Sequence, residues 1–342
     1  MATPLPDNTF TGALFIAYER CKVLEADALA VNTTGPNRGL KGRVLGYLLI
    51  HAPTEEGRMG VQTEIESCIT DVQLMDLAQL YIDHFIRIFK RTAGSTLLTS
   101  SDSSRSSLQK QGTLELLEEA TKKHTTAKEL ALKRDNNRCL VTGKLNSNAY
   151  FLQVETDPTL EGVLCTVTQA SHILPDCLGQ HLKLGNHESS RMLNWVSLAW
   201  DTLGHSGQDN MVSDQLNERD IHHVDNIMTL DMTVHTLFDQ LILWFEPEGD
   251  IPNQYRVCLK REINLGLPNP PVVTFTSSDP RIPLPNARFL KLHAACVKVA
   301  NLSGASEYIE SMLRDVEEIE VLASDGTSAD VLEFALARSS IC

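Results

Sequence analysis

Residues 225–247 read DNIMTLDMTVHTLFDQLILWFEP, an apolar stretch with polar side chains set inside it. Two of these side chains, His235 and Asp239, are four residues apart. On a helix this spacing places two side chains one above the other on the same face. An imidazole and a carboxylate arranged in this way can share one divalent cation. The stretch therefore predicts a helix that carries two metal ligands.

Two further polar residues precede this helix in the chain. The β-branched stretch LEGVLCTVTQASHILP predicts a strand that ends at Pro175, with His172 near its end. Asn226 follows after a long insertion. The order strand–His, strand–Asn, helix–His is that of a ββα-metal finger. A histidine titrates near neutrality and can act as a general base, and an amide side chain can fix a loop by hydrogen bonding.

The chain resembles the HNH endonuclease family, in particular a fungal group of proteins with an HNH nuclease-like domain. The resemblance covers roughly residues 130–320, and it is carried by RDNNRCLVTG, ASHILP, DNIMTLDMTVHTLFDQLILWFEP and FLKLHAACVKVANLSGASEYIESML. It implies that His172 is the general base, that Asn226 is the structural asparagine, and that His235 is a metal ligand. Asp239 matches a position where many members carry a second helical ligand. The resemblance also implies one divalent ion (Mg, Mn or Zn) and a nucleic-acid substrate, with DNA favoured over RNA.

The sequence departs from the family pattern at two places. Many members carry Asp, Glu or His directly before the base, where this chain has Ser171. Cys139 does not begin a C-x-x-C pair that would fasten the finger with zinc. A metal would rest on His235, Asp239 and an unidentified group.

Two assignments around the predicted metal stay open from the sequence alone. Asp239 either binds the metal or orients His235 as its hydrogen-bond partner. His222 and His223, just before Asp225, are either further ligands or residues of a surface loop.

We predict an α+β fold in which a ββα-metal core is enlarged by insertions. A mostly helical N-terminal region spans residues 1–93, and a Ser-rich linker spans residues 94–112. The HNH nuclease-like domain spans residues 113–262, and a helical extension spans residues 263–342. Within the first region, the stretch at residues 13–19 fits either a short strand or the start of a helix.

The charge of the chain bears on its partners. The net charge is -14, and residues 131–262 hold 10 basic and 18 acidic residues. Proteins that bind nucleic acid usually present a basic face, because phosphate neutralisation supplies most of their affinity. Metal-dependent hydrolysis of nucleic acid is the favoured function. The acidic charge keeps two alternatives open, a degenerate HNH fold that serves as a binding module and an enzyme that acts on a small molecule.

The N-terminus and the cysteines bear on location. The start MATPLPDNTF has neither the basic nor the apolar segment of a secretory signal, and no run of about 18 apolar residues exists. The eight cysteines include no C-x-x-C pair, so we expect buried thiols rather than disulfides. These features predict an intracellular protein, in the cytoplasm or the nucleus, without a membrane span.

Overall fold

The structure is a computed structural model of the 342-residue chain. It describes residues 2–7, 10–30, 37–90, 113–120, 124–175, 222–318 and 332. The chain divides into two compact units. The first unit comprises Met1–Lys90, His181–Val212 and Ala295–Cys342, and the second comprises Arg91–Gln180 and Ser213–Ala294.

The described part of the first unit is helical. Its elements are α1 (Gly12–Ala30), α2 (Arg38–His51), α3 (Glu55–Ser67), α4 (Asp71–Tyr81), the π-helical turn η1 (Ile82–Ile86), α5 (Arg87–Phe89) and α14 (Ala305–Glu318). Threonine hydroxyls accept a backbone hydrogen bond at the start of α3 and of α4, where they satisfy N–H groups that the helix itself cannot. Residues 13–19, which fit a strand or a helix, lie in α1.

Helices α1 and α2 approach each other closely at Gly42. A Cβ atom added at Gly42 would lie 2.7 Å from the carbonyl oxygen of Cys21, and so only glycine fits there without a shift. The Cys21 side chain is fully buried, and burial raises the pKa of its thiol to about 12. The thiol therefore stays protonated and packs as a small apolar group.

All six cysteines among the described residues are free thiols, as expected. Four of them are buried, whereas Cys258 is half-buried and Cys165 is exposed. Helices long and apolar enough to cross a membrane are absent from the described ranges.

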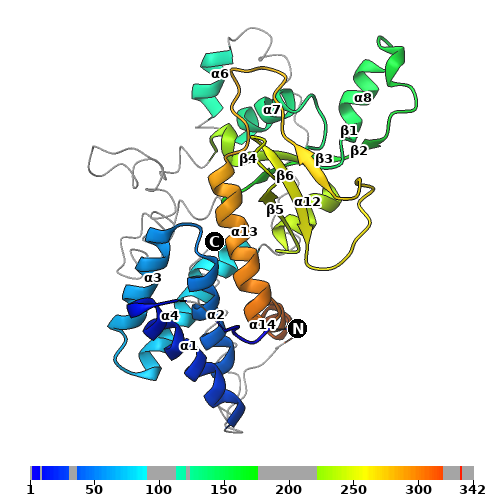
Figure 1. The fold of residues 1–342 in the computed structure, drawn as a ribbon. Helices are drawn as coiled ribbons and strands as arrows, with labels where there is room; N and C mark the ends of the chain where they lie inside the picture. The colour runs from blue at the N-terminus through cyan, green and yellow to red at the C-terminus, as the bar shows by residue number, and fades with distance from the viewer. Residues whose placement is uncertain are drawn as a thin grey trace. The chain divides into compact units, whose positions relative to one another are not determined.

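The second unit combines helices with short strands, which makes the chain α+β as predicted (Figure 1). Its helices include α6 (Thr113–Ala120), α7 (His124–Arg134), α8 (Ser147–Gln153) and α12 (Met232–Asp239), with 3-10 turns η3 (Pro158–Leu160) and η5 (Val224–Asn226). Helix α13 (Ala287–Ser303) begins in this unit. A two-stranded parallel sheet joins β1 (Leu145–Asn146) and β2 (Cys165–Thr166). A three-stranded antiparallel sheet joins β5 (Leu243–Pro247), β6 (Gln254–Leu259) and β7 (Val272–Thr274).

Three of the four predicted site residues lie in a pair of antiparallel strands and the next helix, whereas Asn226 lies in η5, just before the second strand. Strand β3 (Thr168–His172) pairs with β4 (Ile227–Asp231), and the register runs from Thr168 opposite Asp231 to His172 opposite Ile227. Helix α12 follows β4 directly, because the Asp231 carboxylate accepts the Val234 N–H at 2.9 Å and caps the first turn. The local order is therefore strand–strand–helix.

The β3–β4 pair is covered on both faces. Ala170 and Ile227 contact a core of apolar residues from α6 and α7 on one face. On the other face Gln169 contacts His235 of α12. Because side chains alternate along a strand, positions 169 and 172 project from opposite faces of β3.

Strand β3 ends three residues before the predicted end at Pro175. Both backbone groups of Leu174 are bound by the Asn226 side chain, which replaces the pairing that would have continued the strand. Helices α13 and α14 are separated at Gly304, where φ is 89°. Strand β7 lies within residues 263–342, for which a helical extension was predicted. The Ser-rich stretch 94–112 lies outside the described residues.

Candidate active site

The two polar residues of α12 meet as their spacing predicts. His235 Nε2 lies 3.2 Å from Asp239 Oδ2, one turn further along the helix. The side chains are 3% and 13% exposed, so the pair is largely shielded from water. Apolar neighbours on the same helix, among them Val234 and Phe238, are buried and fix its orientation.

A third side chain, Gln169 of β3, bears on which ring nitrogen of His235 carries a hydrogen. Its amide oxygen lies 2.6 Å from His235 Nδ1. That oxygen can only accept, and so Nδ1 carries the hydrogen and donates it. In the neutral ring Nε2 then holds a lone pair, and this lone pair is on the side of the Asp239 carboxylate.

The contact between His235 and Asp239 therefore lacks a hydrogen bond. Although the two atoms are within ion-pair distance, Nε2 is buried and makes no hydrogen bond. A lone pair and a carboxylate oxygen repel each other unless a proton or a metal cation lies between them. Nitrogen and oxygen atoms that share a tetrahedral zinc ion, each about 2.0–2.2 Å from the metal, are about 3.3–3.6 Å apart. The observed 3.2 Å is close to the lower end of this range.

The described residues do not complete a metal site by themselves. Within those ranges no group of three or more His, Cys, Asp or Glu side chains converges. Ser171, at the position where relatives of the family pattern carry a ligand, is fully buried, and its hydroxyl has no hydrogen-bond partner. It projects from the same face of β3 as Gln169, because the two positions are two residues apart.

His172 lies at the end of β3 and contacts a second histidine. Its Nε2 atom is 3.1 Å from Nδ1 of His222, and the ring centroids are 5.2 Å apart. The His172 ring is 6% exposed. The neighbouring His223 makes a different contact, with the carboxylate of Asp225 at 2.6 Å.

Asn226 is buried and joins the two strands beyond their last paired residues. Its Oδ1 accepts the Leu174 N–H at 2.8 Å, and its Nδ2 donates to the Leu174 carbonyl at 3.0 Å. Its own carbonyl accepts the Ile173 N–H at 2.9 Å. The side chain thus fixes the backbone that directly follows His172.

Replacing Asn226 with alanine is expected to loosen this backbone. The change leaves the buried N–H and C=O of Leu174 without these partners, at about 1–3 kcal/mol for each group. Hydrogen exchange of the Leu174 amide should accelerate accordingly. Asn226→Asp keeps the acceptor for that amide and should protect it better than alanine does. Equal exchange rates in the parent and both variants would contradict this role.

A buried ion pair supports the same backbone from the side of α7. Arg134 is fully buried, and its guanidinium donates two hydrogen bonds to Asp135, at 2.7 and 2.9 Å. It also donates to the carbonyls of Val224 and Ile227, which flank Asn226. The Asp135 carboxylate accepts the Thr229 N–H at 3.3 Å. Arg134 and Asp135 therefore hold the start of β4 in place.

The predicted site residues form two groups rather than one. Gln169, His235 and Asp239 form the first, and His172 and His222 form the second. Sequence reasoning missed Gln169 and Arg134, and it left His222 open. The only available signal for Gln169 was a polar residue within a β-branched strand.

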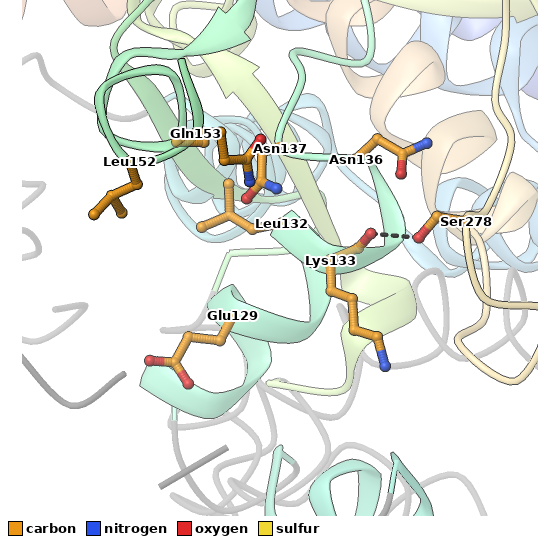
Figure 2. A pocket seen from close by; sticks show the side chains of 9 residues that line it. Glu129, Leu132, Lys133, Asn136, Asn137, Leu152, Gln153 and Ser278 are labelled. Atoms are coloured by element: carbon orange, nitrogen blue, oxygen red, sulfur yellow. Dashed lines mark hydrogen bonds between the residues drawn. The ribbon is translucent and has the colours of Figure 1, made fainter. Parts of the chain in front are cut away.

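A pocket of about 370 Å³ lies elsewhere in the second unit, between α7, α8 and Ser278 (Figure 2). Leu132, Asn137 and Gln153 line it from different elements, and the Ser278 hydroxyl donates to the Lys133 carbonyl at its edge. The predicted site residues are not among those that line it.

Part of the chain matches a known protein family. Residues 139–246 match the family model described as HNH endonuclease, which confirms the predicted resemblance for this part of the chain. The matched segment contains β3, β4 and α12, and it covers less than one third of the 342 residues. Neither the curated proteins nor the solved structures gave a match. The family match supports a nuclease-type function and nucleic acid as the class of partner. The fungal origin stays a prediction.

Proposed function

We propose that the protein is a metal-dependent HNH-type endonuclease that hydrolyses phosphodiester bonds of nucleic acid, with DNA as the preferred substrate. One observation carries the proposal. Gln169 holds His235 so that the Nε2 lone pair is on the side of Asp239. The two atoms, Nε2 and Asp239 Oδ2, are 3.2 Å apart, and both residues lie on the helix of the strand–strand–helix unit formed by β3, β4 and α12. This unit lies inside the segment that matches HNH endonucleases.

His235 and Asp239 would hold the divalent ion. When bound, such an ion stabilises negative charge on phosphoryl and leaving-group oxygens. Gln169 keeps the His235 ring in the tautomer that leaves Nε2 available as a ligand. The rigid packing of α12 reduces the ordering cost of binding, because neither ligand needs to be recruited from a mobile segment.

His172 would accept a proton from the attacking water. An imidazole is suited to this task near neutral pH. Asn226 fixes the backbone on the far side of His172, and β3 fixes it on the near side. The base is therefore held from both directions along the chain.

Metal binding and plasmid cleavage test this function together. Isothermal titration with Mg²⁺, Mn²⁺ and Zn²⁺ should show one site in the parent, and the parent should cleave supercoiled plasmid until EDTA is added. His235→Ala should give no binding heat at concentrations that saturate the parent, and it should lose cleavage. A parent that binds no metal would overturn the proposal in favour of a binding module.

Asp239→Asn decides between the two roles left open for this carboxylate. If Asp239 is a ligand, the variant should behave like His235→Ala. If it only orients His235, affinity should fall about 10–100-fold. Asp250→Asn removes an exposed carboxylate from the turn between β5 and β6 and serves as the matched control. Equal losses in the two variants would show that net charge, and not the site, sets the affinity.

A further inference from the structure

The contact between His172 and His222 has no role in the proposed function as stated so far. The two nitrogens, His172 Nε2 and His222 Nδ1, are 3.1 Å apart, a hydrogen-bond distance. The two residues are 50 positions apart in the chain, at the end of β3 and just before η5. The next residue, His223, contacts Asp225 instead, so the two adjacent histidines have different partners.

A hydrogen bond between two imidazole nitrogens holds a single hydrogen. One ring donates it and the other accepts it with a lone pair. If His222 donated, His172 would carry its remaining hydrogen on Nδ1 and would have no lone pair with which to take a proton from water. If His172 donates from Nε2, its Nδ1 holds the lone pair that a general base requires.

We propose that His222 is a positioning residue that accepts a hydrogen bond from His172 Nε2 and fixes His172 in the tautomer with a basic Nδ1. This inference rests on the proposed function, because it takes His172 as the base. When Nδ1 of His172 gains a proton, the ring becomes a cation that still donates from Nε2. The neutral His222 nitrogen then stabilises that charge through the same hydrogen bond.

The backbone around His222 is also fixed, and this helps to set the orientation of the His172 ring. The turn η5 begins two residues later, and its Asn226 binds Leu174 on the other side of His172. Arg134 holds the carbonyl of Val224 in the same turn. His222, the hydrogen-bond acceptor for His172, is therefore close to backbone that Arg134 and Asn226 hold in place.

Nitrogen-15 NMR of the full-length protein, labelled on histidine, reads the tautomer without any need for activity. The spectra are recorded at a pH of about 8.5, because this is well above the ordinary histidine pKa of about 6.5 and an ordinary imidazole is neutral there. The His172 signals are assigned by their loss in His172→Ala. We expect the Nε2–H tautomer in the parent. We expect a mixture of tautomers in His222→Leu, which has a similar size but no acceptor.

His222→Asn should restore the parent tautomer, because its Oδ1 is as many bonds from the backbone as the histidine Nδ1 and can accept the same hydrogen. His223→Leu, on the same loop, should leave the His172 signals unchanged. In plasmid cleavage His222→Leu should lower kcat about 10–100-fold with little change in KM, the range seen when partners that orient a functional histidine are lost. His222→Asn should recover most of that loss.

Two results would overturn the inference: an Nδ1–H tautomer of His172 in the parent, or unchanged His172 signals in His222→Leu. A plain loss of fold would instead alter the remaining histidine signals in all variants, and recovery in His222→Asn would be missing. If the tautomer results hold while the parent fails to cleave plasmid, the proposed nuclease function falls and the structural assignment of His222 stands.

Discussion

His172→Ala is expected to lower the rate of plasmid cleavage by about 10²–10⁴-fold, the usual contribution of a general base. Metal affinity should stay close to that of the parent, because His172 belongs to the group with His222 and not to the group with His235 and Asp239. Single-turnover cleavage at saturating metal, alongside calorimetric titration of the same metal, measures both quantities.

The variants His235→Ala and His172→Ala should thus differ in the properties that they lose. His235→Ala loses metal binding and cleavage together, whereas His172→Ala loses cleavage alone. If His172→Ala also lost metal binding, then the two groups would share one ion, and His172 would be a ligand. If it retained full activity, another group would supply the base.

Arg134→Met is expected to destabilise the second unit by about 3–5 kcal/mol, the usual result of removing one partner of a buried ion pair. The change leaves the Asp135 carboxylate buried without its cation and removes the donor to the Val224 and Ile227 carbonyls. Native-state hydrogen exchange at amides of β4, such as that of Thr229, measures the loss of stability in this part of the second unit.

Two variants make this test specific. Arg134→Met combined with Asp135→Leu should recover part of the lost stability, because a well-packed apolar pair no longer buries an unpaired charge. Arg281→Met breaks another Arg–Asp pair, with Asp279, whose arginine side chain is 58% exposed. Solvent screening makes such a pair weak, so the effect should be much smaller. Equal effects of the two arginine substitutions would show that burial of Arg134 is not what matters.

The α12 helix shows how far the sequence alone can lead. A spacing of four residues inside an apolar stretch was enough to predict that His235 and Asp239 share one face, because the contact is local. The break between α13 and α14 also has a local cause, because Gly304 adopts a positive φ there.

Contacts between residues far apart in the sequence could not be predicted from local patterns. Alternation along β3 assigns Gln169 to a face, but it does not say that α12 covers that face. His222 follows His172 by 50 residues, and no periodicity relates the two. The end of β3 depends on the Asn226 side chain, which comes from outside the strand. Each of these details is set by tertiary packing, which local patterns do not encode.

The way Asn226 closes the end of the β3–β4 pair has a consequence for the length of the connection between these strands. The hydrogen bonds between Asn226 and the residues Ile173 and Leu174 hold the two ends of that connection next to each other. A change in the number of residues within the connection therefore need not displace His172.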